Sequence, residues 1–180
     1  NVMLRKVLPY KLESFASVAM LCSGPLTLTV NAEKMPANDV KSFVARAKSR
    51  TKPLFYGTLG PGSVTHLYGI VMSQSMGFEV TDIAYRNNPT SIMDLLSGEC
   101  DLSFATPSAV MEHVKAGKLK VLALSTEKRM PNLPNIPTFA ESGYPQLTAS
   151  FWTALHAPAG TPADTIKRLN EAANTALKAP

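Results

Sequence analysis

The fold is decided by one stretch of the chain, which reads Tyr56-Gly57-Thr58-Leu59-Gly60-Pro61-Gly62-Ser63-Val64-Thr65-His66-Leu67. An apolar run typical of a strand, Leu54 to Tyr56, leads into it, and apolar residues at helical spacing continue as far as Met76. Gly77 then stands where helices commonly end in a left-handed residue. The stretch therefore predicts a strand, a glycine-rich loop and the N-terminus of a helix.

Two interpretations of this loop stay open. Glycines let a backbone approach a ligand closely, and the unpaired amides and dipole of a helix N-terminus attract an anion. Alternatively, the loop is an ordinary strand-to-helix turn with Ser63 as the N-cap. The glycine spacing is not G-x-G-x-x-G, and no Gly-Lys-Ser/Thr follows, so a nucleotide phosphate site is disfavoured. Under the first interpretation, a small anion of carboxylate size remains compatible with the loop.

The same alternation of strand and helix continues along the chain. Strand patterns cover residues 78–85, 101–105 and 119–124, and helical patterns lie between them. Pro89 and Pro107 each suit the first turn of a helix, and Gly98 and Gly117 each suit a helix end. The order β-α-β-α-β-α-β with short links is typical of an α/β fold with a parallel sheet. Ligands of such sheets bind beyond the carboxyl ends of the strands.

The flanking segments are less regular. Residues 1–16 are expected to wrap an edge, and short strands are expected at 18–21, 26–30 and within 147–155. Further helices are expected after an Asn38 cap, at 139–142, and after a Thr161–Asp164 capping box.

Two further strand ends carry candidate binding groups. Arg86 follows a strand, where it either pairs with a carboxylate or is a solvated surface side chain. Thr106 follows another strand and offers a hydroxyl cap at a helix N-terminus. Three such junctions at one sheet edge indicate a ligand site more strongly than any one of them.

Several functional classes are disfavoured. The 180 residues are 45% hydrophobic and 17% charged with a net charge of +5, and basic runs are not interleaved with aromatics, so nucleic-acid binding is not expected. No run of eighteen apolar residues is present to span a membrane. The three histidines and the two cysteines fit no metal spacing, and nothing indicates a cofactor. Cys22 and Cys100 form either one disulfide or two small buried thiols. His66 is expected to be a hydrogen-bonding helix residue in the first place, with a ligand contact and then a catalytic base as the alternatives.

Several motifs together resemble one family. They are the glycine loop at 57–67, Tyr85 with Asp94 to Asp101, Lys115 to Ala123, Leu133 to Gly143, and Ala157 to Pro162. In order and spacing this chain is similar to the tripartite tricarboxylate transporter receptors, also called Bug or TctC-like proteins. The resemblance implies a two-lobed, type II periplasmic binding fold of α/β class, with 1–29 ending the first lobe, 30–150 forming the second and 151–180 returning to the first. It implies an exported, periplasmic receptor, not an enzyme, which delivers a small organic acid to membrane permease subunits.

The resemblance also implies a set of ligand contacts. They are Thr58, Gly60, Gly62, Ser63, Thr65, His66, Tyr85, Arg86, Phe104, Ala105 and Thr106. Arg86-Asn87 stands where the family usually has Lys-Gly, and Ala105 stands where it often has an acid, which favours an anionic ligand. The chain starts at Asn1 without an initiator methionine, so we expect a fragment whose export signal and first-lobe ligand loop precede it.

Two other classes compete with this interpretation. One is the effector-binding domain of an intracellular regulator with the same topology. The other is a small-molecule hydrolase that uses Ser63 and His66, although no G-x-S-x-G elbow is present.

Overall fold

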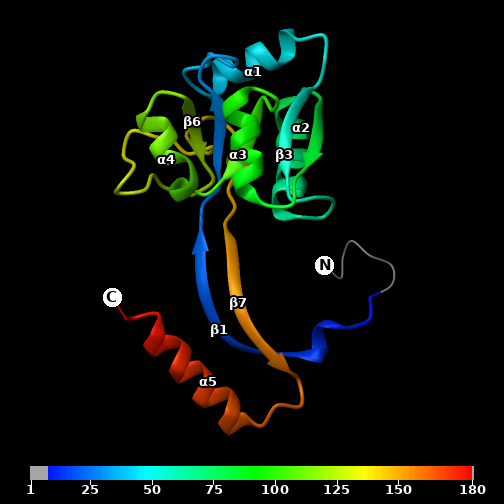
Figure 1. Ribbon diagram of the computed structural model, residues 1–180, viewed down its shortest axis with the longest axis vertical. Helices are drawn as coiled ribbons and strands as arrows, with labels where there is room; N and C mark the ends of the chain where they lie inside the picture. The colour runs from blue at the N-terminus through cyan, green and yellow to red at the C-terminus, as the bar shows by residue number, and fades with distance from the viewer. Residues whose placement is uncertain (1–7, 180) are drawn as a thin grey trace. The chain divides into compact units, whose positions relative to one another are not determined.

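The structure is a computed structural model that describes residues 8–179. Within this range the chain forms two compact units, one of residues 8–24 with 151–179 (unit 1) and one of residues 25–150 (unit 2). Figure 1 shows the elements of each unit. The predicted lobe limits of 1–29, 30–150 and 151–180 stay predictions. Residues 1–7 and 180 of these ranges lie outside the described residues.

Unit 2 is built on a five-stranded sheet with the strand order β4-β3-β5-β2-β6. Its strands are β2 (Thr27–Asn31), β3 (Leu54–Thr58), β4 (Val80–Ala84), β5 (Leu102–Ala105) and β6 (Leu119–Leu124). β3 pairs in parallel with β4 and β5, whereas β2 pairs antiparallel with both β5 and β6. The predicted parallel relation therefore holds for the four strands separated by helices. The sheet as a whole is mixed, because β2 enters it from the other direction between β5 and β6.

Four helices connect these strands. They are α1 (Val40–Ser49), α2 (Val64–Met76), α3 (Asn88–Ser97) and α4 (Pro107–Lys115). Side chains of successive residues on β3 show that α2 and α3 pack on opposite faces of the sheet. A Cβ atom at Gly57 would lie 2.0 Å from Ser91 Oγ of α3, whereas the Tyr56 ring lies against Gly69 of α2. The two-residue period of a strand places these neighbours on opposite faces.

The core lies on both faces of the central strands. On one face, buried residues of α3, α4 and β6 form a continuous cluster that includes Leu95, Val110 and Leu119. On the other face, the Tyr68 ring packs edge-on to Phe104 with the ring centroids 4.7 Å apart. Every residue of β2 and of β5 is buried. Because side chains pack on both faces of these strands, the positions of the strand ends, and of the turns that follow them, are fixed by the core.

Unit 1 is a two-stranded antiparallel ladder with one long helix. β1 (Phe15–Gly24) pairs with β7 (Phe151–Pro158), and α5 (Ala163–Ala176) follows. The Asn170 side chain of α5 donates to the Val18 carbonyl at 2.6 Å. The strands expected at 18–21 and 147–155 are thus present, but they are longer or shifted. Both pair with each other rather than with the large sheet.

Several local expectations were wrong. Asp39, not Asn38, is the N-cap of α1, because its carboxylate accepts from the Ser42 amide at 2.7 Å. Residues 139–142 form hydrogen-bonded turns rather than a helix, and a short 3-10 helix follows at Pro145–Leu147. The Thr161–Asp164 capping box is absent, since α5 begins after Pro162 without a side-chain cap. A short 3-10 helix at Leu12–Ser14 precedes β1.

Both cysteines are free thiols. Cys100 is buried, as expected, but Cys22 lies exposed on β1, so only one of the two is a buried side chain.

Candidate functional site

The glycine-rich loop joins β3 to α2 as predicted. Ser63 is the N-cap of α2, and its hydroxyl accepts from the His66 amide at 3.2 Å. Gly60 and Gly62 have φ values of 91° and 80°, which side chains rarely adopt. Gly77 ends the helix with a φ of 71°. The predicted roles of Ser63 and Gly77 in this helix are therefore confirmed.

Hydrogen bonds within the loop fix its shape. The Thr65 hydroxyl accepts from the Leu59 amide at 3.1 Å, and the Thr58 hydroxyl accepts from the Gly60 amide at 3.1 Å. The Thr58 hydroxyl also lies 3.4 Å from the Asp82 carboxylate of β4. Threonines at 58 and 65 are both buried. The loop is therefore held in one conformation by its own side chains before any ligand arrives.

Two amides of this loop keep their hydrogens unused. Among the hydrogen bonds of the described residues, the Val64 and Thr65 amides have no acceptor, whereas the next two amides are bonded to Ser63. Both belong to the first turn of a thirteen-residue helix, where the dipole adds positive potential. Two aligned donors at a positive helix end form a suitable seat for one carboxylate group.

The His66 ring is part of the same loop. Its Nδ1 atom accepts from the Gly62 amide at 3.3 Å, so the proton of a neutral ring resides on Nε2. Among the hydrogen bonds of the described residues, that Nε2–H has no acceptor. The Ser63 hydroxyl contacts the His66 amide and the Thr65 hydroxyl rather than the ring. The loop therefore presents donors and lacks the serine–histidine contact on which nucleophilic catalysis depends.

The second junction follows β4. The Tyr85 amide donates to the Thr58 carbonyl at 2.9 Å, which fixes this turn to the end of β3. Arg86 follows and is exposed. Asn87 is the N-cap of α3, and its side chain accepts from the Thr90 amide at 3.0 Å. Pro89 is thus the second residue of the helix, within the first turn as predicted. Because Pro89 lacks an N–H, this helix does not offer the two adjacent first-turn amides that α2 offers.

The Tyr85 side chain turns away from this edge. Its hydroxyl donates to Asp94 at 2.8 Å and lies 3.0 Å from the Cys100 sulfur. Burial, followed by the bonds to Cys100 and Asp94, raises the pKa of Tyr85. Burial likewise raises the pKa of the Cys100 thiol. The hydroxyl thus braces α3 internally, and only the Tyr85 backbone and ring remain near the strand end.

The third junction follows β5. Phe104 and Ala105 are buried, and the Ala105 carbonyl accepts from the Thr27 hydroxyl at 3.0 Å. Thr106 is the N-cap of α4, but its hydroxyl makes no cap bond and instead lies 3.1 Å from the Ser108 hydroxyl. Pro107 again removes one first-turn amide. At this junction the Thr106 hydroxyl is therefore the main polar group, because Pro107 removes one of the first-turn amides.

Strand directions bring the three junctions to one edge of the sheet. β3 is parallel to both neighbours, and Thr58 lies opposite Ala84 in the β3–β4 register. The carboxyl ends of the three strands therefore point the same way, with the glycine loop in the middle. The glycine-loop candidates share one compact turn, and Arg86 and Thr106 follow the adjacent strands. The Tyr85 hydroxyl bonds to Asp94 instead, and the buried Phe104 ring packs against Tyr68. The ligand roles of all eleven residues stay predictions.

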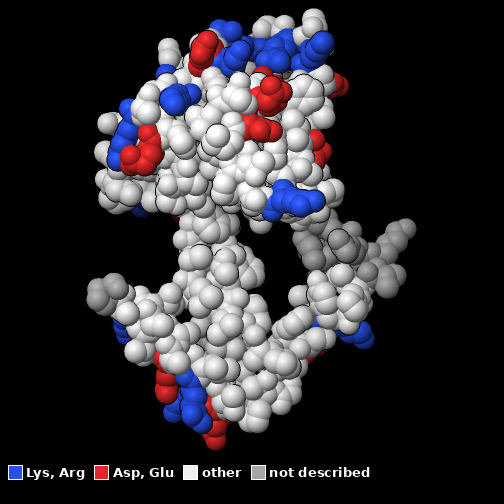
Figure 2. All heavy atoms as spheres, viewed as in Figure 1, with Lys and Arg blue, Asp and Glu red and all other residues white. Residues whose placement is uncertain are grey.

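The opposite edge of the sheet carries a basic segment that the sequence reasoning passed over. Arg46, Lys48, Arg50 and Lys52 occur within seven residues, without an acidic residue among them. Lysine and arginine side chains gather over α1 in Figure 2. A pocket of about 400 Å³ lies beside this segment and is lined by its residues and by 77–79.

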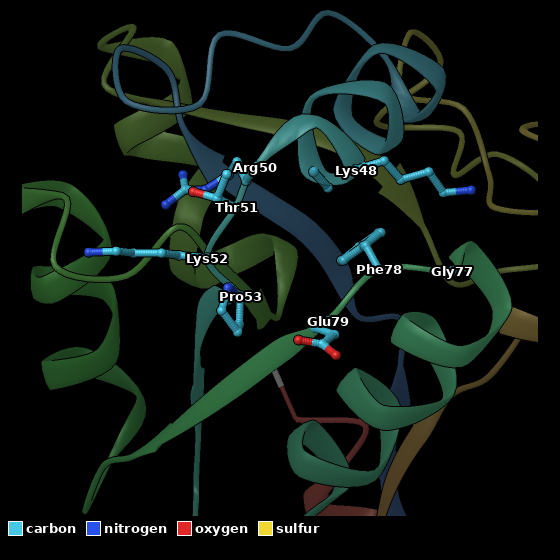
Figure 3. Close-up of a pocket in the computed structure, with 9 residues that line it drawn as sticks. Lys48, Arg50, Thr51, Lys52, Pro53, Gly77, Phe78 and Glu79 are labelled. Atoms are coloured by element: carbon cyan, nitrogen blue, oxygen red, sulfur yellow. The ribbon is translucent and has the colours of Figure 1, made fainter.

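This pocket is not a built anion site. Figure 3 shows Lys48 and Lys52 extending in opposite directions rather than converging. Arg50 is already paired, since its guanidinium lies 2.8 Å from the Asp101 carboxylate. The other Asp101 oxygen accepts from the Phe55 amide at 2.8 Å. The segment therefore braces the start of β3.

Metal-ligand clusters and membrane-spanning helices are both absent from residues 8–179. In that range no three histidine, cysteine or acidic side chains come together as metal ligands. Nor does any helix there combine the length and apolar character required to cross a membrane.

Comparison with known proteins identifies relatives of this chain. The sequence family described as tripartite tricarboxylate transporter family receptor, TctC, matches residues 3–180. Protein BugT of Bordetella pertussis is 33% identical over 172 residues, which are 95% of this chain and 52% of BugT. The chain thus spans about half the length of this curated relative.

Solved structures give the same result for the fold. The periplasmic binding protein BugD has a TM-score of 0.86 at 26% identity, over 95% of this chain and 57% of BugD. Rhodopseudomonas palustris Rpa4515, solved with adipate, has a TM-score of 0.87 at 29% identity, over 98% of this chain and 59% of that one. MatC from the same organism, solved with bound malate, has a TM-score of 0.88 at 27% identity, over 99% and 60%. These similarities confirm the predicted periplasmic binding fold, and the chain belongs to the tripartite tricarboxylate transporter receptor family.

Proposed function

We propose that the protein is a periplasmic solute-binding receptor that captures a small carboxylate and delivers it to the membrane permease of a tripartite tricarboxylate transporter. The observation that carries the proposal is the pair of unused amides at residues 64 and 65. They lie at the positive end of α2, in a loop whose shape is fixed by its own hydrogen bonds.

The ligands of the structural relatives support the same chemistry. Rpa4515 was solved with adipate and MatC with malate, and both are dicarboxylates. In this chain, one carboxylate group would lie at the start of α2 and accept from the two amides and from His66 Nε2. A second anionic group would reach the exposed Arg86, which follows the neighbouring strand. Export to the periplasm and docking to permease subunits are parts of this proposal that rest on the family.

The proposed action is binding without chemical change. The only serine and histidine close together in the candidate site are Ser63 and His66. Their hydrogen bonds build the loop, and the Ser63 hydroxyl does not contact the His66 ring. No observation favours the regulator or the hydrolase over the receptor.

The test removes one amide without disturbing the helix. Val64 is the first residue of α2 and is 54% exposed, and Ser63 has the extended ψ of 160° that precedes proline readily. In the full-length receptor, Val64→Pro is expected to weaken carboxylate binding about tenfold, because hydrogen bonds to charged groups contribute about 1.5–3 kcal/mol. Isothermal titration with malate and adipate measures the change, after a thermal-shift panel that also contains tricarboxylates, amino acids and neutral sugars.

The matched control is Ala163→Pro, which removes the corresponding amide from the start of α5. It is expected to leave carboxylate affinity unchanged. A receptor that is stabilised by a neutral sugar and by no carboxylate would overturn the proposal. So would full carboxylate affinity in the Val64→Pro variant.

A further inference from the structure

The two ends of unit 2 meet at one serine. Ser125 follows β6 and is fully buried. Its hydroxyl accepts from the Leu26 amide at 2.8 Å and donates to the Ala149 carbonyl at 2.6 Å. Its backbone completes the pattern, since the Ser125 amide donates to Leu26 and the Ala149 amide donates to the Ser125 carbonyl, both at 2.9 Å. One residue therefore makes four hydrogen bonds to two segments that are far apart in sequence.

These two segments are the connections between the units. Unit 2 begins at Pro25 and ends at Ser150, so the chain passes between the units only next to Leu26 and Ala149. On the other side of each connection, Gly24 lies opposite Phe151 as the last pair of the β1–β7 ladder. The bonds to Ser125 therefore lie within one or two residues of both points where the chain leaves unit 2.

A tyrosine links the same place to the glycine-rich loop. Tyr68 lies in the second turn of α2, and its hydroxyl donates to the Leu147 carbonyl, two residues before Ala149. Its ring is buried against Phe104 and Phe139. Burial raises the pKa of Tyr68, and the Ser125 side chain has a smaller, opposing effect. The helix that starts with the unused amides is thus joined to the last segment of unit 2.

We propose that Ser125 and Tyr68 form a clamp that holds the two connecting segments together and fixes them to α2. The clamp is a positioning device rather than a ligand contact. It keeps the two ends of unit 2 together, and it holds α2 in a constant relation to them. Its effect on ligand capture rests on the proposed function, whereas its structural part does not.

The structural part is tested without ligand, by amide hydrogen exchange in the full-length protein. Ser125→Ala removes the only acceptor of the Leu26 amide, which is expected to exchange about tenfold faster, since it loses a buried hydrogen bond. The Ala149 amide bonds to the backbone of residue 125, which the substitution leaves in place. If the four bonds act as one clamp, this amide also exchanges faster. Tyr68→Phe is expected to speed exchange at Ala149 as well, although the lost hydroxyl bonds to Leu147 and to neither the Ala149 amide nor the Ser125 carbonyl.

The matched control is Ser103→Ala. Ser103 is also a buried serine and lies in the central strand β5, but its hydroxyl makes only a 3.4 Å contact with Ser91. Exchange at Leu26 and Ala149 is expected to equal that of the wild type in this variant. Unchanged exchange at Ala149 in both clamp variants would overturn the clamp, even if Leu26 responds. Equal acceleration in Ser103→Ala would overturn it too, because the effect would then be general loosening.

The ligand part uses malate and adipate as probes. Wild-type protein that binds either probe is expected to show slower exchange at Ala149, and Tyr68→Phe is expected to lose at least half of that slowing while it still binds. A retained response in Tyr68→Phe would overturn the connection between α2 and the clamp. If neither probe binds the wild type, the proposed function fails in its carboxylate form, and the exchange results without ligand still decide the clamp.

Discussion

At the scale of single residues, this site depends on where side chains are absent. A Cβ atom added at Gly69 would lie 2.1 Å from the Tyr56 ring, which is buried beneath α2. The Tyr56 hydroxyl in turn donates to the His66 carbonyl at 3.1 Å. Burial, with a smaller effect of the Asp82 charge, raises the pKa of Tyr56 to about 12, so the phenol keeps its proton at neutral pH. One glycine therefore sets how closely the first turns of α2 approach β3.

This contact leaves no room for a side chain at position 69. Gly69→Ala is expected to lower the free energy of unfolding by about 1–3 kcal/mol, because overpacking a filled core forces the ring or the helix to move. Urea denaturation followed by circular dichroism measures the loss. In a Tyr56→Leu background the added methyl has room, so the same substitution is expected to cost less.

Gly160→Ala is the control for this prediction. A Cβ atom there meets nothing within 4 Å, and the residue has no positive φ. Its free energy of unfolding should match that of the wild type. A Gly69→Ala variant as stable as Gly160→Ala would show that α2 yields freely, and the loop would then be less firmly placed than its hydrogen bonds indicate.

At the scale of elements, local signals were predictable and partners were not. Ser63, Gly77 and Gly98 end or begin helices as their residue types predict, since a cap needs only its own neighbours. The direction of β2 was not predictable, because its apolar alternation is the same in either direction. The pairing of β1 with β7 joins segments more than a hundred residues apart, and nothing in either segment names its partner.

The site shows the same division. The glycine loop and the strand ends were visible in the sequence, because each is a local motif. The difference between the three junctions was not foreseen, although Pro89 and Pro107 were noted as helix starts. Each proline removes one first-turn amide, so of these three helices only α2 keeps both of its first two amides. The bond from Leu26 to Ser125 spans 99 residues and left no local signal.

In the turn at 138–143, hydrogen bonds from side chains to the backbone take the place of the expected helix. The Glu141 carboxylate accepts from the Thr138 amide at 2.8 Å and lies 2.9 Å from the Arg129 guanidinium. These two contacts, the first being the larger, hold the pKa of Glu141 below its ordinary value of 4.5. A lowered pKa means that the carboxylate stabilises the fold at pH values above 4.5, and that this stabilisation is lost as the pH falls through the lower folded pKa.

Glu141→Gln is therefore expected to be less stable than the wild type at neutral pH, with the gap closing as the pH is lowered. Denaturant midpoints measured across the acid range give the result. In an Arg129→Met background the Glu141 carboxylate keeps its larger contact, the one with Thr138. The loss of stability caused by Glu141→Gln at neutral pH should therefore become smaller but not disappear. A gap of equal size at neutral and at acid pH would contradict the assignment.

At the scale of the whole molecule, the two units have very different means of stabilisation. Unit 2 has a five-stranded sheet whose strands β2 and β5 are buried along their whole length. Unit 1 has two strands and one helix, and α5 contains no buried residue. Large apolar side chains of its strands remain open, with Met20 61% and Trp152 60% exposed. A two-stranded ladder is at best marginally stable in water, whereas a sheet covered on both faces is stable by itself.

Amide exchange across the 180-residue chain should follow this contrast. Amides of β1 and β7 are expected to exchange on the order of a hundredfold faster than those of β2 and β5, because the ladder opens without unfolding unit 2. Peptide-resolved exchange measured by mass spectrometry separates the two sets. The same measurement on the full-length protein, whose relatives are about twice as long, is expected to slow exchange in β1 and β7 and leave β2 unchanged. Equal exchange rates in β1 and β7 and in β2 and β5 of the 180-residue chain would mean that unit 1 is held by more than its own hydrogen bonds. The division into two independently opening units would then have to be abandoned.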